Sequence, residues 1–308
     1  MTKSAIYISE PDAINVERAF AALAGSYDLI SGSPDLYDAP QHSDCTAMMI
    51  RSETHVDDTI LQTFPKLAHI IRVGTGVDNI DLEFCKRSDI AVYNAAGANA
   101  DAVSEYVATM TLTALRKTHL VASDDVVEWN RFKFRGRGVS ECTIGIVGFG
   151  NIGRLIYAKL RAFNCENFYI YDPYVSADAL PKYITKVESL DDLLPQCDVI
   201  TLHVPLIDST RNLIDTTQLQ QMRDNAILIN ASRGGIVHEE AVSRHADEHA
   251  EFTYVADTVD GEPQVNSCLL ERRNILVTPH IASLTGASEQ SMLDTAVQNF
   301  LNKSAMKL

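Results

Sequence analysis

The segment that decides the fold lies at residues 143–153 and reads Thr143-Ile144-Gly145-Ile146-Val147-Gly148-Phe149-Gly150-Asn151-Ile152-Gly153. Residues 143–147 predict a short buried strand, and an amphipathic helix begins directly after the segment. Between strand and helix, Gly148 is expected to make a tight turn, Gly150 to let the backbone approach a pyrophosphate, and Gly153 to let the helix pack on the strand. The N-terminus of the helix then offers free N–H groups to the phosphates. The segment therefore predicts a phosphate-binding turn.

An acidic residue at the right distance strengthens this interpretation, because a GxGxxG motif by itself is weak evidence. A second predicted strand ends in Asp172, nineteen residues after Gly153. A carboxylate at this place accepts hydrogen bonds from both ribose hydroxyls of a dinucleotide and repels a 2′-phosphate. The alternative is an aspartate that only caps the strand before Pro173. The two signals together predict NAD, rather than NADP, as the cofactor.

Short β-branched runs alternate with amphipathic stretches along the chain. We expect strands at residues 4–8, 47–50, 69–73, 91–93, 143–147, 167–171, 199–202, 226–230, 252–256 and 275–277. We expect helices at residues 13–23, 101–116, 152–163, 217–222, 239–249 and 288–302. Such alternation is typical of βαβ units, so the sequence predicts an α/β fold of two Rossmann- or flavodoxin-like domains with parallel sheets.

The turn at Gly97-Ala98-Asn99, followed by the long predicted helix, marks the expected domain boundary. We expect a substrate-binding domain at residues 1–98 and 286–308, because the last helix could return to the first domain. The NAD-binding domain is expected at residues 99–285. Two such domains would leave a cleft between them, which is the usual place for a ligand.

The composition excludes several classes of function. The 308 residues carry 26 Lys and Arg against 41 Asp and Glu, and the net charge of −15 disfavours nucleic acids and anionic membranes as partners. No apolar run approaches the roughly 18 residues of a membrane span, and we expect no signal peptide. The six cysteines are far apart and form no CxxC pair, which favours reduced thiols in a cytoplasmic protein.

Polar side chains follow three of the predicted strands in the second half of the chain. Arg233 comes after the strand at 226–230, Asp257 and Glu262 follow the next strand, and His280 follows the strand at 275–277. Each could be structural by itself, as part of a surface ion pair, an acidic loop or a strand end. However, ligands bind at the carboxyl ends of strands in open α/β sheets. Hydride transfer needs one group that anchors the substrate and one that exchanges a proton with it, and these residues could supply both.

Several short motifs follow one another along the chain: Gly74-Thr75-Gly76-Val77-Asp78-Asn79-Ile80-Asp81-Leu82, the Gly148–Gly153 turn, Tyr171-Asp172-Pro173, His203-Val204-Pro205-Leu206, Ala231-Ser232-Arg233-Gly234-Gly235, Glu262-Pro263 and Thr278-Pro279-His280. In these motifs the sequence resembles the D-isomer-specific 2-hydroxyacid dehydrogenases, over residues 5 to 300. The resemblance implies an oxidoreductase that interconverts a D-2-hydroxy acid and its 2-keto acid with NAD, without a metal ion.

The resemblance also implies a role for each matching residue. Arg233 would orient the keto acid, His280 would be the general acid and base, and Glu262 would hold the His280 ring and favour its protonated form. Asp257 would contact the nicotinamide side of the cofactor. The other implied cofactor contacts, beside the three glycines of the turn, are Thr75, Asn151, Ile152, Asp172, Val204, Pro205, Ala231, Ser232 and Ser283.

Within the family, residues 50–56, 71–79 and 129–132 resemble the phosphoglycerate dehydrogenases. The resemblance implies that Arg51, Arg72 and Arg131 surround the substrate's phosphate, one of them across a homodimer interface, with Ser52, Gly74 and Gly76 as further substrate contacts. Arginine binds phosphate through two hydrogen bonds, and an acidic protein must concentrate positive charge to hold a trianion. We therefore expect 3-phosphoglycerate and 3-phosphohydroxypyruvate as substrates. Sulfolactate, hydroxypyruvate and glyoxylate dehydrogenases share the same sequence frame, so their substrates stay open as alternatives. A further alternative is that the three arginines are ordinary surface residues.

Three rival interpretations come from other classes of protein. The run His245-Ala246-Asp247-Glu248-His249 matches the HxxEH motif of zinc peptidases, but acidic residues surround it and no third ligand is evident. A non-catalytic NAD(H)-sensing corepressor has the same fold, and only turnover of a defined acid would distinguish it. The helix at 101–116 could belong to a structural oligomerisation module, or it could pack inside the chain.

Overall fold

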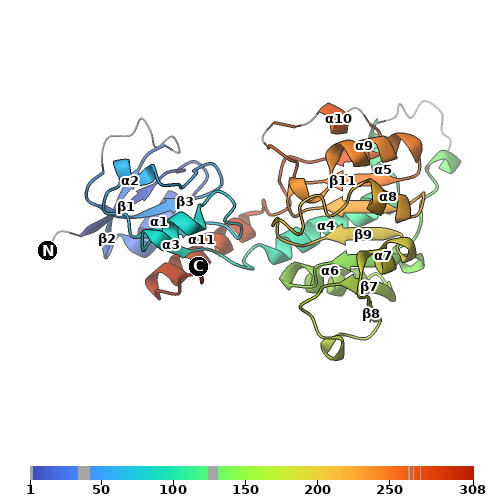
Figure 1. Cartoon of the computed structure of the whole chain (residues 1–308), viewed down its shortest axis with the longest axis horizontal. Coiled ribbons are helices and arrows are strands. Elements are labelled where there is room, and N and C mark those ends of the chain that lie inside the picture. Colours follow the sequence, from blue (N-terminus) through green and yellow to red (C-terminus); the bar gives the residue numbers. More distant parts are fainter. Residues whose placement is uncertain (1–2, 34–41, 124–130, 263, 266, 271) are drawn as a thin grey trace. The chain divides into compact units, whose positions relative to one another are not determined.

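The computed structural model describes residues 3–33, 42–123, 131–262, 264–265, 267–270 and 272–308. The chain divides into two compact units (Figure 1). Unit 1 comprises Met1–Asn99 and Thr285–Leu308, and unit 2 comprises Ala100–Leu284. Each unit is built around its own parallel sheet, so the predicted α/β fold is confirmed.

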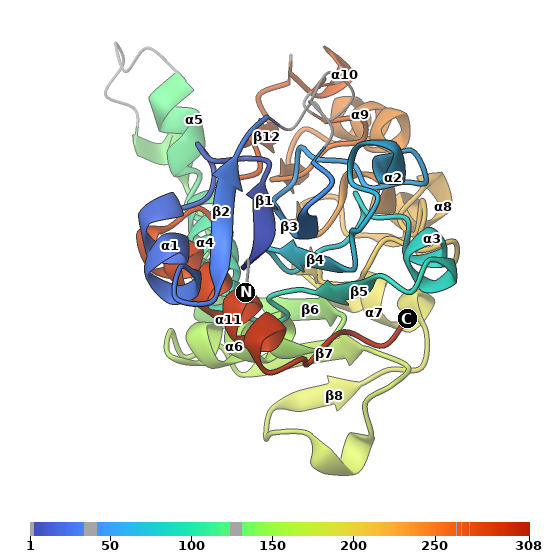
Figure 2. The same cartoon turned by 90° about the vertical axis from the view of Figure 1, so that its left-hand side faces the viewer.

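The described part of unit 1 contains a five-stranded sheet in the order β2-β1-β3-β4-β5 (Figure 2). Its strands are β1 (Ser4–Ile8), β2 (Tyr27–Ser31), β3 (Cys45–Ile50), β4 (His69–Arg72) and β5 (Ala91–Tyr93). Its helices are α1 (Val16–Leu23), α2 (Ile60–Thr63), α3 (Leu82–Arg87) and α11 (Gly286–Leu301). Alternate residues of β1 enter two cores, since Ile6 packs with residues of α1 and α11 whereas Tyr7 packs with Phe64. Both faces of the sheet are therefore covered.

The described part of unit 2 contains a seven-stranded sheet in the order β12-β11-β10-β9-β6-β7-β8. Its strands are β6 (Thr143–Val147), β7 (Asn167–Tyr171), β8 (Ile184–Lys186), β9 (Val199–Leu202), β10 (Ile227–Asn230), β11 (Thr253–Ala256) and β12 (Ile275–Val277). Its α-helices are α4 (Ala100–Leu115), α5 (Thr118–Ser123), α6 (Asn151–Arg161), α7 (Leu190–Leu193), α8 (Thr216–Gln221), α9 (Glu239–Glu248) and α10 (Ser267–Leu270). Short 3-10 turns lie at Arg131–Phe134, Val139–Glu141, Ala177–Ala179, Leu194–Gln196 and Gly234–Ile236.

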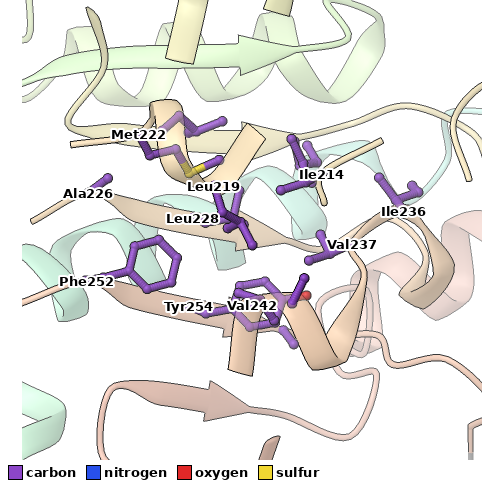
Figure 3. Packing of buried hydrophobic residues seen from close by; sticks show 14 of the residues in the cluster. Ile214, Leu219, Met222, Ala226, Leu228, Ile236, Val237, Val242, Phe252 and Tyr254 are labelled. Atoms are coloured by element: carbon purple, nitrogen blue, oxygen red, sulfur yellow. The ribbon is translucent and has the colours of Figure 1, made fainter. Parts of the chain in front are cut away.

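Two buried clusters cover the two faces of this sheet. Ile144 and Ile146 of β6 pack with residues of α4 and α6, whereas Val147 belongs to the cluster that contains Phe252 and Tyr254. Figure 3 shows Phe252, just before β11, and Tyr254 of β11 packed near side chains of α8 and α9. The strand order reverses direction on either side of β6, because β7 and β9 are its two neighbours. This reversal is the place where doubly wound sheets bind dinucleotides.

The structure corrects some predicted boundaries. Helix α1 begins at Val16 rather than at residue 13, because the Asn15 side chain caps it by accepting a 2.9 Å hydrogen bond from the Arg18 backbone N–H. Strands β2 and β8 were not predicted, and both lie at the edges of their sheets. No helix among the described residues is long and apolar enough to cross a membrane.

Candidate active site

The turn after β6 has the geometry that a pyrophosphate requires. Gly148 has a φ of +90°, and a Cβ at this residue would lie 2.4 Å from the His203 carbonyl oxygen. A Cβ on Gly153 would lie 2.4 Å from the Gly148 oxygen, so α6 can pack this close to the strand only because residue 153 is glycine. At Gly150 a Cβ would meet nothing within 4 Å, and Gly150, as the N-cap of α6, has no side chain that could cap the first N–H groups of the helix. The open space beside free N–H groups fits a phosphate group.

Asp172 lies at the end of β7 and supports the same turn. Its Oδ2 accepts a 2.8 Å hydrogen bond from the Phe149 backbone N–H, and its Oδ1 accepts one of 2.8 Å from the Tyr174 N–H. A carboxylate can accept about four hydrogen bonds, so two positions are left for the ribose hydroxyls. The sequence pattern gave no sign of the contact with Phe149.

His280 and Glu262 form a hydrogen-bonded pair. The distance between His280 Nδ1 and Glu262 Oε1 is 2.8 Å, and about two fifths of each side chain is exposed (45% and 38%). Because a carboxylate only accepts, Nδ1 carries the proton and Nε2 is left for another partner. Partial burial raises the pKa of Glu262, but the hydrogen bond and charge of His280, with a smaller contribution from Arg233, hold it below its ordinary value.

Asp257 is buried, and its carboxylate accepts hydrogen bonds from the segment that carries His280. Oδ1 accepts hydrogen bonds from Thr278 Oγ1 at 2.7 Å and from the Ile281 N–H at 2.8 Å, and Oδ2 accepts one from the Ala282 N–H at 2.9 Å. The Asp257 carbonyl oxygen also accepts a 2.8 Å hydrogen bond from the His280 N–H. This residue, expected beside the nicotinamide, therefore holds the histidine segment in place.

Arg233 is also positioned by a buried side chain at the end of its strand. Asn230 donates a 2.7 Å hydrogen bond from Nδ2 to the Arg233 carbonyl and accepts one of 3.1 Å from the Ser232 N–H. Gly234 lies so close to the loop that carries Glu262 that a Cβ there would be 2.0 Å from the Val259 carbonyl carbon. The three predicted catalytic side chains thus stand on interlocked loops of one unit.

The remaining expected cofactor contacts divide between the two units. In unit 2, Val204 Cγ1 would lie 3.2 Å from a Cβ on Gly148, and Ser232 Oγ donates a 2.6 Å hydrogen bond to the Leu202 carbonyl. Ile152, Ala231 and Ser283 are half-buried, whereas Pro205 and Asn151 are exposed. In unit 1, Thr75 donates from Oγ1 toward the Ala95 carbonyl at 3.2 Å and the Asn99 Oδ1 at 2.9 Å.

The arginines expected at the substrate differ in their surroundings. Arg51 Nη1 donates to the Ala13 carbonyl at 2.8 Å and forms a 3.2 Å ion pair with Glu289. Arg72 is buried, and its Nη1 donates a 2.9 Å hydrogen bond to the Val73 carbonyl. Arg131 belongs to unit 2 and is exposed, with its guanidinium over the Phe132 ring. The structure therefore places Arg51 and Arg72 together in unit 1 and Arg131 in the other unit.

A buried residue that the sequence did not indicate organises the Arg51 loop. Glu10 is 4% exposed, and Oε1 accepts hydrogen bonds from the Arg51 N–H at 2.8 Å and the Thr54 N–H at 3.0 Å. Its Oε2 accepts one of 3.1 Å from the Glu53 N–H. Asn79 connects this loop to Arg72. Its Nδ2 donates a 2.9 Å hydrogen bond to the Arg51 carbonyl, and its Oδ1 lies 3.4 Å from Arg72 Nε. Of the other expected contacts, Ser52 is exposed, Gly74 is buried and Gly76 is half-buried.

The HxxEH run begins on α9 and ends at His249, just after the helix, and its His245 and Ala246 are buried. The rings of His245 and His249 stack with centroids 4.2 Å apart, and the Phe252 ring meets His245 edge-on at 4.7 Å. No group of three or more potential metal-ligating side chains was found in the described ranges. The two histidines are thus occupied by aromatic packing.

The parallel sheet, its reversal at β6 and the turn at Gly148 define a dinucleotide-binding domain. Residues 108–282 match the family profile described as "D-isomer specific 2-hydroxyacid dehydrogenase, NAD binding domain". The chain belongs to this family, whose members are NAD-dependent oxidoreductases.

Relatives with different substrates resemble the chain to a similar degree. It is 36% identical to an (S)-sulfolactate dehydrogenase of Chromohalobacter salexigens over 82% of each chain. It is 33% identical to a D-3-phosphoglycerate dehydrogenase of Methanocaldococcus jannaschii over 80% of this chain, which spans 48% of that relative. Among solved structures, a glyoxylate reductase from Paecilomyes thermophila has the same fold, with a TM-score of 0.86 at 24% identity over 99% of this chain and 97% of that one.

Proposed function

We propose that the chain interconverts a D-2-hydroxy acid and its 2-keto acid with Arg233, Glu262 and His280 as catalytic residues. The observation that carries this proposal is the 2.8 Å hydrogen bond between His280 Nδ1 and Glu262 Oε1. It leaves Nε2 to give a proton to the keto oxygen during reduction and to take it from the hydroxyl during oxidation. Arg233 binds the carboxylate of the acid through its planar guanidinium and so fixes the orientation of the carbonyl.

NAD, which carries the hydride to or from C2 of the acid, would be held mainly by unit 2. The free N–H groups at the start of α6 hold its pyrophosphate, and Asp172 accepts hydrogen bonds from its ribose. Further cofactor contacts would come from the loops that follow β9 and β10, which contain Val204, Pro205, Ala231 and Ser232. Unit 1 acts as the substrate-binding domain.

We further propose that the acid carries a second anionic group on C3, which Arg51 binds. The Arg51 Nη1 is engaged by Ala13 and Glu289, and its side chain is 17% exposed. The phosphate of 3-phosphoglycerate is the first candidate, because the residues around Arg51, Arg72 and Arg131 resemble those of phosphoglycerate dehydrogenases. A sulfonate is the second candidate. It carries one negative charge, which suits an arginine that already shares its charge with a carboxylate 3.2 Å away.

Initial rates of NADH oxidation with four 2-keto acids test these proposals. The acids are 3-phosphohydroxypyruvate, sulfopyruvate, hydroxypyruvate and glyoxylate. A phosphate or sulfonate group should raise kcat/KM by more than tenfold over hydroxypyruvate, since a charged hydrogen-bonded pair contributes about 1.5–3 kcal/mol. Arg51→Ala should remove that preference and leave glyoxylate turnover unchanged. Equal losses on all four acids would overturn the role of Arg51, and no turnover with bound NADH would favour a sensor.

We also propose that the protein works in the cytoplasm as a homodimer. All six cysteines are free, and five of them are buried. The resemblance to phosphoglycerate dehydrogenases, in which one of the arginines matching Arg51, Arg72 and Arg131 reaches across a homodimer, supports the dimer. The mass in solution, measured by light scattering, tests the dimer.

A further inference from the structure

A chain of hydroxyl groups connects helix α4 to the segment that carries His280. Tyr106, in the first half of α4, has its Oη 2.6 Å from Thr278 Oγ1. Thr278 follows β12, and its Oγ1 lies 2.7 Å from Asp257 Oδ1. All three residues belong to unit 2, although 172 positions separate Tyr106 from Thr278 in the sequence. None of these three residues belongs to the turn at Gly148.

The direction of the hydrogen bonds in this chain can be assigned. The Asp257 carboxylate only accepts, so the single hydroxyl proton of Thr278 points to Asp257. The Thr278 oxygen therefore has to accept, and Tyr106 has to donate. Burial, together with the nearby charge of Asp257, raises the pKa of Tyr106 to about 12 despite the Thr278 hydrogen bond, so the phenol keeps the proton that it donates.

The segment held by this chain has a strained residue in it. His280 has a φ of +52°, a conformation that costs a residue other than glycine about 1 kcal/mol or more. Thr278 precedes His280 by two residues, and the Ile281 and Ala282 N–H groups that follow it both donate to Asp257. Asp257 thus binds the segment on both sides of the strained residue, and Thr278 is one of its contacts.

We propose that Tyr106 and Thr278 are positioning residues for His280, because their directed hydrogen bonds orient the Asp257 carboxylate that holds His280 in its left-handed conformation. Neither side chain takes part in proton transfer. The inference rests on the proposed catalytic role of His280. Loss of the Tyr106 hydroxyl leaves Thr278 free to rotate and lets the segment relax, and displacement of a catalytic group by a fraction of 1 Å lowers the rate steeply.

The test uses three variants and a matched control. Tyr106→Phe should lower kcat about tenfold with NADH affinity unchanged, because only the orientation of His280 is disturbed. Thr278→Val should lower kcat further, since it removes the partner of the half-buried Tyr106 hydroxyl and the hydrogen bond to Asp257. Thr278→Ser keeps the hydroxyl and should retain nearly the wild-type kcat. Tyr157→Phe is the control, because it also removes a tyrosine hydroxyl, which donates to the Lys182 carbonyl at 2.6 Å and not to the segment that carries His280.

Hydrogen exchange at the Ile281 and Ala282 amides gives a readout that does not depend on turnover. Faster exchange in Tyr106→Phe and Thr278→Val than in Tyr157→Phe supports the proposal. The proposal is overturned if kcat and the exchange rate of Tyr106→Phe match those of the wild type, or if only the thermal stability of this variant falls. It is also overturned if kcat falls as much in Thr278→Ser as in Thr278→Val. His280→Ala, assayed in parallel, tests the catalytic role of His280 separately, since its full activity would overturn that role without affecting the exchange result.

Discussion

Glu262 accepts a 2.8 Å hydrogen bond from His280 although the two residues stand on loops that follow different strands, β11 and β12. The loops are held separately, because Asp257 binds the histidine segment and Glu239 Oε1 accepts a 2.7 Å hydrogen bond from the Asp260 N–H beside Glu262. The pair therefore depends on two buried carboxylates, those of Asp257 and Glu239.

The first prediction concerns the charge of Glu262. The pKa of its carboxyl lies below the ordinary value, so Glu262 is ionised and the pair intact at neutral pH, and the pair is lost as the pH falls through that lowered value. Glu262→Gln keeps an acceptor oxygen but removes the negative charge that pairs with His280. The kcat for keto-acid reduction, measured from pH 5 to 9, should fall, and its pH profile should differ from that of the wild type. Asp260→Asn, which changes an exposed carboxylate of the same loop, should leave the profile in place.

The second prediction concerns Asp172. Asp172→Asn can accept hydrogen bonds on one oxygen only, so either the Phe149 or the Tyr174 N–H loses its partner and the ribose loses a charged acceptor. NADH affinity should fall about tenfold, because a hydrogen bond to a charged group contributes about 1.5–3 kcal/mol. The preference for NADH over NADPH should narrow as well, since the repulsion of a 2′-phosphate is removed. Fluorescence titrations with both cofactors measure this, and an unchanged ratio of the two affinities would contradict it.

Local patterns predicted the buried strands and the edge strands β5 and β12, but they missed the edge strands β2 and β8. All four residues of β9 and of β10 are buried, and each strand shows in the sequence as a mainly apolar run with one polar residue. Strand β2 reads Tyr27-Asp28-Leu29-Ile30-Ser31 and has no buried residue, and β8 has only three residues, none of them buried. An edge strand pairs on one side only, so its pattern carries less of the apolar signal.

The same limit applies to the site. Motifs indicated which residues follow the strands, because turn glycines and strand ends leave a local signature. They did not indicate the groups that hold those residues, since Glu10 lies 41 positions from Arg51 and Tyr106 lies 172 positions from Thr278. Such contacts arise only when the sheet brings distant segments together, and no spacing rule describes them.

The third prediction separates two glycines of the turn. Gly153→Ala places a Cβ 2.4 Å from the Gly148 backbone oxygen, so α6 has to shift and the protein should lose about 2 kcal/mol of stability together with NADH binding. Gly150 has a φ of −80° and open space at its Cβ, so Gly150→Ala should keep the wild-type melting temperature. It should still weaken NADH binding, because the methyl group stands where a phosphate approaches. Equal melting temperatures for the two variants would contradict the packing role of Gly153. Wild-type affinity for NADH in Gly150→Ala would contradict the phosphate-binding role of Gly150.

The last prediction concerns stability at acidic pH. Burial, with the charge of His249 as a smaller cause, lowers the pKa of His245 to about 4. The unfolded chain therefore binds a proton at this residue from about pH 6.5 downward, whereas the folded chain binds it only near pH 4. Because the unfolded state holds more protons in this window, the free energy of unfolding should fall as the pH drops from 6.5 to 4. His245→Phe keeps a ring against Phe252 and should flatten this dependence, whereas His55→Gln, at an exposed histidine, should not. Urea unfolding at pH 7, 6 and 5 measures the slopes, and a His245→Phe slope equal to that of the wild type would mean that His245 is protonated in the fold.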